Sequence, residues 1–239
     1  GINTGDFGRT TGEPFIDLLR ALDRVEGIDR YRISSIEPNL LTDEVIAFTA
    51  ASKRFQSHFH IPIQSGSDRI LALMRRRYNT AQFADRIAAV RRAVPDVFLG
   101  IDVIVGFPGE TDEDFADTYR FLERLAPAFL HVFPYSARPD TPAAGFPNRV
   151  PPPVAERRAA ELGALSERLH RAFYEKQVGT QARVLWESTR RNGYMYGYTG
   201  NYVKVRTPFD RALINTITPV KLTATDGEEV MDAAILSRE

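Results

Sequence analysis

The sequence contains no cysteine among its 239 residues, and this absence removes several kinds of chemistry together. Disulfide bridges, thiolate nucleophiles and thiolate metal sites all require that side chain. The chain also lacks a continuous run of about 18 apolar residues and a leader-like pattern at its start, so neither a membrane span nor a secretory signal is indicated. We therefore expect a cytoplasmic protein without a membrane partner.

The net charge of the chain is zero, because 31 lysines and arginines balance 31 aspartates and glutamates. A nucleic-acid partner would have to be held by a local basic patch rather than by the overall field of the protein. The content of 43% hydrophobic and 26% charged residues is typical of a globular protein. The length fits a medium domain, alone or with a small one attached.

Strand and helix patterns alternate between Tyr31 and Gln177. Apolar runs predict strands, Thr42 and Thr80 are expected to cap helices, and Thr111 with Asp114 predicts a helix start that resembles a capping box. Such alternation favours parallel strands joined by right-handed crossovers, which is an α/β fold. The segment Gly1 to Gly8 is typical of a loop after a strand, so we expect the chain to begin inside a larger fold. The expected strands are 31–34, 58–63, 98–105 and 129–133.

In folds of this kind, the loops after the carboxyl ends of the strands build the functional site. The turn from Gly106 to Glu110 brings backbone close to the region above the sheet, because glycine has no Cβ to block a nucleotide-like ligand. The same turn could instead be a tight connection without a ligand. Glu37, Gln64 and Ser65 follow strands at the same end and could bond a ligand or cap their own loops.

One acidic residue and two histidines lie within the expected strands. Asp102 interrupts an apolar strand, so it needs a partner inside the fold. His58 and His60 share one strand face, at a spacing compatible with metal binding. No carboxylate or cysteine accompanies them at ligand spacing, and the sequence therefore favours hydrogen-bonded core histidines and no metal site.

From Val178 onward, short alternating segments and turn residues predict a small antiparallel β-barrel. The Asn192-Gly193 step is a strong signal for a hairpin. The expected domains are therefore residues 1–177 and residues 178–239.

Tyrosines and cations gather on two successive strands of the expected barrel. Alternation places Tyr194, Tyr196 and Tyr198 on one face of the first strand, and Tyr202, Lys204 and Arg206 on one face of the second. Such a surface can stack bases and neutralise phosphates. Alternatively, the tyrosines belong to the barrel core and the cations are ordinary surface residues.

Several segments together resemble the radical-SAM methylthiotransferases, and the resemblance runs in order from Gly1 to about Leu236. It includes a terminal TRAM domain, an OB-like barrel that binds RNA. The amino-acid sequences of residues 32–38 and 60–67 are most similar to those of the MiaB-like branch, which acts on threonylcarbamoyladenosine beside the tRNA anticodon. The segments that carry the resemblance are 61–68, 74–78, 102–111 and 131–143.

This resemblance implies a partial (β/α) radical-SAM barrel, without its N-terminal strand and cluster loop, followed by a TRAM barrel. Family members use S-adenosylmethionine and two 4Fe-4S clusters, one held by a three-cysteine loop and one by an N-terminal domain. This chain has neither set of cysteines. The full-length parent is therefore expected to be the transferase, whereas this chain alone is expected to bind no cluster, to contain no catalytic residue and to be inactive.

The resemblance also assigns binding residues by position. The residues expected around S-adenosylmethionine are Asn3, Glu37, Gln64, Ser65, Arg138 and the turn Gly106-Phe107-Pro108-Gly109-Glu110. The residues expected to contact the anticodon region of tRNA are Arg190, Arg191, Tyr202, Lys204 and Arg206. Affinity for RNA should fall as the salt concentration rises.

Three alternatives remain open. The parent could modify an aspartate of a ribosomal protein or isopentenyladenosine in tRNA, and assays of the full-length protein separate these substrates. The chain could also be a non-catalytic RNA-binding protein that keeps the barrel as a scaffold. An exposed barrel edge argues against the last alternative, because unpaired strand edges promote association.

Overall fold

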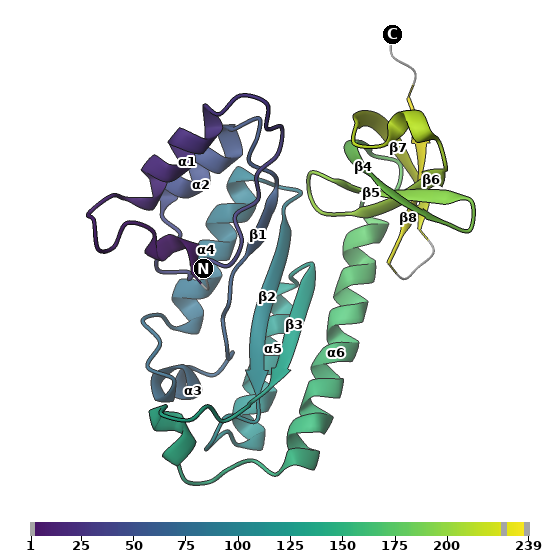
Figure 1. Ribbon diagram of the computed structural model, residues 1–239. Coiled ribbons are helices and arrows are strands. Elements are labelled where there is room, and N and C mark those ends of the chain that lie inside the picture. Colours follow the sequence, from purple (N-terminus) through teal and green to yellow (C-terminus); the bar gives the residue numbers. More distant parts are fainter. Residues whose placement is uncertain (1–2, 226–228, 237–239) are drawn as a thin grey trace. The chain divides into compact units, whose positions relative to one another are not determined.

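The computed structural model describes residues 3–225 and 229–236 (Figure 1). Gly1, where the resemblance begins, and the last three residues of the expected small barrel lie outside the described residues. The chain divides into two compact units, Gly1–Ser166 and Glu167–Glu239. Helix α6, Pro152–Glu175, crosses this division, because Tyr174 near its end belongs to the core of the second unit. The domain boundary near Gln177 stays a prediction.

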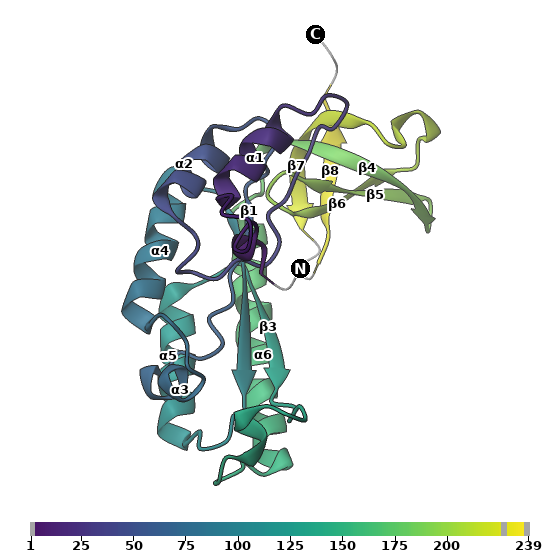
Figure 2. The same cartoon turned by 60° about the vertical axis from the view of Figure 1, so that its left-hand side comes forward.

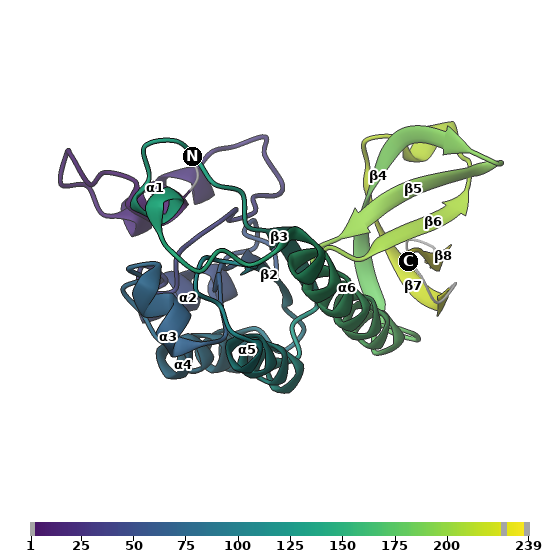
Figure 3. The same ribbon diagram turned by 90° about the horizontal axis from the view of Figure 1, so that it is seen from below.

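The first unit is built on a parallel sheet in the order β1-β2-β3, as the alternation of strands and helices predicted. Figure 3 shows α4 and α5 along one side of these strands, and Figure 2 shows the same layering from another direction. The elements are η1 (Thr4–Asp6), α1 (Phe15–Asp23), α2 (Asp43–Ala51), β1 (His58–His60), α3 (Asp68–Leu73), α4 (Thr80–Ala93), β2 (Phe98–Val105), α5 (Asp112–Leu125), β3 (Phe129–Pro134), η2 (Pro142–Gly145) and α6.

The central strand β2 has one apolar face and one partly polar face. Ile101, Val103 and Val105 are completely buried, which places the core on their side of the sheet. Asp102 and Ile104 alternate with them and are partly exposed on the opposite face. The sheet therefore offers a face with chemical groups, held in place by a core on the other side.

Two of the three predicted helix caps are confirmed. The Thr42 hydroxyl accepts a hydrogen bond from the Val45 amide, and Thr111 with Asp114 forms a capping box at the start of α5. The prediction that Thr80 caps α4 was wrong. Asn79 is the cap, because its extended backbone lets its side chain accept from Gln82 while Gln82 bonds back to the Asn79 amide.

Two expected strands are shorter in the structure. Residues 31–34 form only isolated bridges, at Tyr31 to Phe55 and nearby at Ser35 to His60. The strand expected at 58–63 ends at His60, although the amides of Ile61, Ile63 and Gln64 still bond to carbonyls of β2. Gln64 has a φ of 73°, so the chain leaves the extended conformation there.

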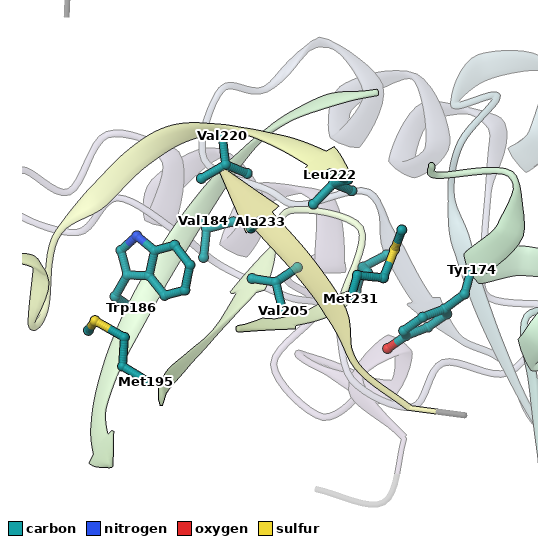
Figure 4. Close-up of a cluster of buried hydrophobic side chains, with 10 residues drawn as sticks. Tyr174, Val184, Trp186, Met195, Val205, Val220, Leu222, Met231 and Ala233 are labelled. Carbon is teal, nitrogen blue, oxygen red and sulfur yellow. The ribbon is translucent and has the colours of Figure 1, made fainter. Parts of the chain in front are cut away.

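The second unit is a closed five-stranded barrel in the order β4-β5-β6-β8-β7. The predicted barrel is present, but it is mixed rather than purely antiparallel, because β6 and β8 pair in parallel. Its core surrounds the single tryptophan, Trp186, with Val184, Met195, Val205 and Leu222 (Figure 4). The elements are β4 (Gln181–Arg191), β5 (Tyr194–Thr199), β6 (Lys204–Pro208), η3 (Arg211–Leu213), β7 (Ile217–Thr225) and β8 (Met231–Ile235).

The hairpin predicted at Asn192-Gly193 joins β4 to β5. Both residues have positive φ, 51° and 81°, as a two-residue hairpin turn of type I′ requires. The strand predicted to begin at Tyr202 begins instead at Lys204, since Tyr202 lies in a turn with a φ of 63°. Tyr202 therefore reaches the barrel surface from a turn and not from the face of a strand.

Candidate functional site

Asn3 and Glu37, two of the residues expected near S-adenosylmethionine, lie together in the structure. The side-chain oxygen of Asn3 accepts hydrogen bonds from the amides of Gly5 and Glu37, at 3.3 and 3.1 Å. Asn3 thus ties the first loop to the loop after residue 34, and its own amide group donates to Asp6. This contact joins segments that are distant in the sequence at one edge of a cleft.

The cleft has a volume of about 690 Å³ and is lined mainly by charged and polar residues. The Arg76 guanidinium lies 3.2 Å from the Glu37 carboxylate, and both side chains are partly exposed. Other arginines and acidic side chains contribute both signs of charge. A cleft of this kind can hold a ligand that carries an ammonium and a carboxylate. Its charged residues are Asp6, Arg9, Glu13, Glu37, Arg75, Arg76 and Arg77.

Gln64 and Ser65 occupy different environments although they are adjacent. Gln64 is partly exposed at the end of the sheet, where its backbone amide donates a hydrogen bond to the Asp102 carbonyl. Ser65 is buried, and its hydroxyl oxygen lies 3.3 Å from that of Thr118 and accepts from the Ser67 amide. The Ser65 hydroxyl is therefore used within the fold.

The turn from Gly106 to Glu110 is closed by its own contacts. A Cβ at Gly106 would lie 2.7 Å from the Cβ of Ala155, so the glycine serves close packing against α6. The buried Glu110 carboxylate accepts from the Gly106 amide at 3.0 Å and from Arg158 at 2.6 Å. Burial raises the pKa of the Glu110 carboxyl, and the nearby Arg158 opposes that shift.

The remaining residues of the turn also have partners in the protein. Phe107 packs edge-on against Tyr135, with ring centroids 5.2 Å apart. Pro108 is buried, and the Gly109 amide donates to the Asn148 carbonyl. Arg138 is exposed in the loop after β3. The structure therefore brings Asn3 and Glu37 together, whereas the turn residues make their contacts with other parts of the fold.

A cluster of polar side chains lies on the partly exposed face of the sheet. His60 Nε2 is 2.5 Å from Asp102 Oδ1, and the ring of His131 stacks on that of His60 with centroids 4.9 Å apart. Asp102 thus has the partner that the sequence requires. Sequence spacing around His60 did not indicate this carboxylate, because Asp102 comes from a different strand. We call His60, Asp102 and His131 the histidine–aspartate cluster.

The residues of this cluster can be recognised as neighbours only when the strand register is known. Asp102 on β2 pairs directly with His131 on β3, so both side chains are on the same face. His58, which spacing had linked to His60, instead stacks on Phe98 with ring centroids 5.5 Å apart. Burial lowers the pKa of His58 to about 4 and also lowers that of His131, so both rings are neutral near pH 7.

The outer surface of the barrel presents aromatic and basic side chains together. The Arg206 guanidinium lies over the Tyr194 ring at 5.3 Å, and the Lys204 ammonium over the Tyr196 ring at 5.8 Å. The rings of Tyr198 and Tyr202 stack with centroids 5.0 Å apart. We call these residues the tyrosine face: Tyr194, Tyr196, Tyr198, Tyr202, Lys204 and Arg206.

The tyrosines of β5 do not belong to the barrel core. Met195, Gly197 and Thr199 alternate with them and are buried, which leaves the tyrosines outside. Tyr194 and Tyr202 are 38% and 39% exposed. Arg190 and Arg191 are exposed at the end of β4 beside the hairpin turn, and Arg190 lies over the Phe209 ring at 4.9 Å. Aromatic rings thus lie beside Lys204 and Arg206 on the tyrosine face, with Arg206 also paired to Asp232, an arrangement that suits single-stranded nucleic acid.

Comparisons with known proteins agree with this architecture. The family model described as "Radical SAM superfamily" matches residues 7–122. The chain is 41% identical over 228 residues to the threonylcarbamoyladenosine tRNA methylthiotransferase MtaB of Bacillus subtilis, covering 93% of this chain and 51% of that protein. It is 39% identical over 228 residues to the tRNA-2-methylthio-N(6)-dimethylallyladenosine synthase of Wolinella succinogenes, covering 93% and 53%.

The chain thus spans about half the length of the curated relatives that it matches. Among solved structures, it resembles the coproporphyrinogen III oxidase HemN of Escherichia coli, a radical SAM enzyme, with a TM-score of 0.53. That similarity has 14% identity and covers 98% of this chain and 57% of the other, so it concerns the fold alone. Among the described residues, no helix has the length and apolarity that crossing a membrane requires.

Proposed function

Because this chain belongs to the radical-SAM methylthiotransferase family, we propose that the full-length protein methylthiolates threonylcarbamoyladenosine next to the anticodon of tRNA. The observation that carries this proposal is the 41% identity to MtaB, which extends over 93% of the chain. A tRNA substrate also favours a cytoplasmic location.

A second candidate substrate is isopentenyladenosine in tRNA. The chain is 44% identical over 187 residues to the tRNA-2-methylthio-N(6)-dimethylallyladenosine synthase of Thermobifida fusca. That match covers 77% of the chain, against 93% for MtaB. Coverage does not separate the two substrates, because the Wolinella succinogenes synthase also matches 93% of the chain, at 39% identity. Threonylcarbamoyladenosine is the first candidate on the 41% identity to MtaB over the same length.

The residues of this chain do not fit a 4Fe-4S cluster. Such clusters are held by cysteine thiolates, and the chain has no cysteine. We therefore propose that this chain alone does not methylthiolate RNA, and that two clusters are held elsewhere in the full-length protein. This chain would contribute part of the barrel, contacts to the ligand and contacts to RNA.

The charged cleft beside Asn3 supports a site for S-adenosylmethionine. Glu37 can accept a hydrogen bond from an amine or hydroxyl of the ligand, while Arg76 balances its charge. Asn3 holds the Glu37 loop in position through its bond to the Glu37 amide. Ser65 and Glu110 are buried and fix the backbone of their own loops.

The tyrosine face supports a contact with unpaired tRNA bases. Exposed tyrosine rings can stack on bases, whereas Lys204 and Arg206 can neutralise phosphates. Arg190 and Arg191 add two cations at the neighbouring hairpin. Because these contacts are partly electrostatic, each phosphate neutralised should contribute about −0.7 to the slope of log K against log salt for single strands.

The experiment that tests the function is nucleoside mass spectrometry of total tRNA from cells lacking the full-length gene, with and without complementation. We expect methylthio-threonylcarbamoyladenosine to disappear and to return on complementation. If that nucleoside persists and methylthio-isopentenyladenosine disappears, the second candidate is correct. If no methylthio nucleoside changes, the ribosomal-protein aspartate and the non-catalytic RNA-binding protein become the alternatives to test.

A further inference from the structure

The histidine–aspartate cluster is a group of potential metal ligands that the proposed function does not use. One nitrogen from each of His60 and His131 and one oxygen from Asp102 all lie within 4.8 Å of one another. The three residues come from β1, β2 and β3, which are neighbours in the sheet (Figure 1). Three strands thus deliver two imidazoles and one carboxylate to one place.

The backbone under this cluster is held firmly. His60 pairs with Gly100, and Asp102 with His131, so the strand register fixes which side chains meet. The residues adjacent to the cluster alternate to the other face, and all except the partly exposed Val132 are fully or almost fully buried: Phe59, Ile61, Ile101, Val103 and Leu130. Only side-chain rotations remain free. Sites on such rigid elements keep the positions of their ligands well defined.

The ligand types match a recognised class of metal site. Zinc sites that keep an open position use three protein ligands and a water molecule, and two histidines with one carboxylate is one of the sets found. The same set with open positions binds non-haem iron(II). We propose that His60, Asp102 and His131 bind one divalent transition-metal ion, with water completing its coordination.

Metal binding requires only small movements of the three side chains from their present positions. Metal–ligand bonds of about 2.0–2.1 Å in a tetrahedron separate the ligand atoms by about 3.3 Å. The His60 and Asp102 atoms, now 2.5 Å apart through a hydrogen bond, would move apart slightly, and His131 would move inward. When the ion binds His60 Nε2, the ring carries its proton on Nδ1, so metal bonds to Nε2 and to the Asp102 carboxylate replace the hydrogen bond between them. Side-chain exposures of 27% for His60 and 19% for Asp102 give an ion access.

Cobalt(II) is the probe, because its visible absorption reports coordination geometry. The 239-residue chain is prepared without a histidine tag, stripped with a chelator and titrated with cobalt chloride. Having no cysteine, the chain cannot give a thiolate signal, so nitrogen and oxygen ligands account for any spectrum. We expect one cobalt ion per chain, displaced by zinc, with visible bands typical of a four- or five-coordinate ion.

The variants H131A and D102N should weaken cobalt binding at least about 100-fold, because loss of an outer-shell partner alone costs about 10–100-fold. H58A is the matched control, since His58 lies on the same strand as His60 and stacks on Phe98 instead. It should bind cobalt as the unaltered chain does. Circular dichroism of the metal-free variants shows that each is folded.

The proposal is overturned if the unaltered chain gives only the spectrum of hydrated cobalt. It is also overturned if folded H131A binds as tightly as the unaltered chain, or if H58A loses binding as fully as H131A does. In these cases His60 and Asp102 are a hydrogen-bonded pair without a metal. Because the titration uses no RNA and no S-adenosylmethionine, its result is independent of the proposed enzymatic function.

Discussion

Replacing Arg158 with methionine should destabilise the first compact unit by about 3–5 kcal/mol, the usual cost of leaving one member of a buried ion pair without its partner. The side chains of Arg158 and Glu110 are only 4% and 3% exposed, and their charged atoms are 2.6 Å apart. In the variant, the Glu110 carboxylate keeps its hydrogen bond from the Gly106 amide but loses its ion pair with Arg158. The exposed partner of Arg158, Asp112, should contribute little.

The loss of stability caused by R158M should depend on pH. Burial already raises the pKa of Glu110, and Arg158 lowers it, so the variant should raise the pKa further. A carboxyl with a raised pKa in the folded state binds more protons than in the unfolded state, and lowering the pH through that window favours folding. The loss of stability caused by R158M should therefore be smaller at pH 5 than at pH 7.

The assay is urea unfolding followed by two signals. Circular dichroism reports the helices, most of which are in the first unit, while fluorescence reports Trp186 in the barrel. With a slope of about 2 kcal/mol per molar urea, the dichroism midpoint should fall by about 1.5–2.5 M. The fluorescence midpoint should move much less, since Trp186 belongs to the second unit.

R157M is the matched control, because Arg157 makes only a 3.7 Å contact with Glu161 on the helix surface. It should change stability by less than about 0.5 kcal/mol. If R158M is unfolded without urea, the double variant E110Q/R158M should recover at least half of the lost stability, because it removes the buried charge. Equal midpoints for R158M and R157M at pH 7 would refute the reasoning.

Three further predictions concern packing, capping and RNA binding. G197A should destabilise the barrel by about 1–3 kcal/mol, because its Cβ would lie 2.5 Å from the Leu185 carbonyl oxygen; a Trp186 fluorescence transition equal to that of the unaltered chain would contradict this. N79A should cost about 1 kcal/mol through loss of the α4 cap, measured by dichroism, and T80A should cost less. K204A should weaken binding of an anticodon stem-loop in fluorescence anisotropy and lower the salt slope by about 0.7, whereas K221A, an exposed lysine on β7, should leave both unchanged.

Several features of this protein are determined by local sequence, and these were predictable. Strand β2 was placed correctly because eight successive residues suit a buried strand and a turn follows at Gly106. The capping box of Thr111 and Asp114 and the hairpin turn at Asn192-Gly193 were also correct. Each depends on side chains and backbone angles within a few residues, so nearby sequence is enough to specify it.

Other features were decided only when distant segments met. Residues 31–34 could not form a full strand, and the sequence could not show this, because pairing depends on the partner strand. The sequence did not show that Arg158, 48 positions later, pairs with Glu110, and the role of Glu110 at a ligand stays a prediction. The tyrosines of β5 could have faced either side of the barrel, since alternation separates two faces without saying which is inside.

The histidine–aspartate cluster depends partly on local sequence and partly on tertiary structure. The sequence alone determined that Asp102, in an apolar strand, needs a partner, because a lone buried charge is costly. Only the tertiary structure decided that His60 and His131 are beside it, on strands separated by 42 and 29 positions of chain. Side-chain type and alternation are local properties of a strand, whereas register between parallel strands is set by the packing of the helices and core that connect them.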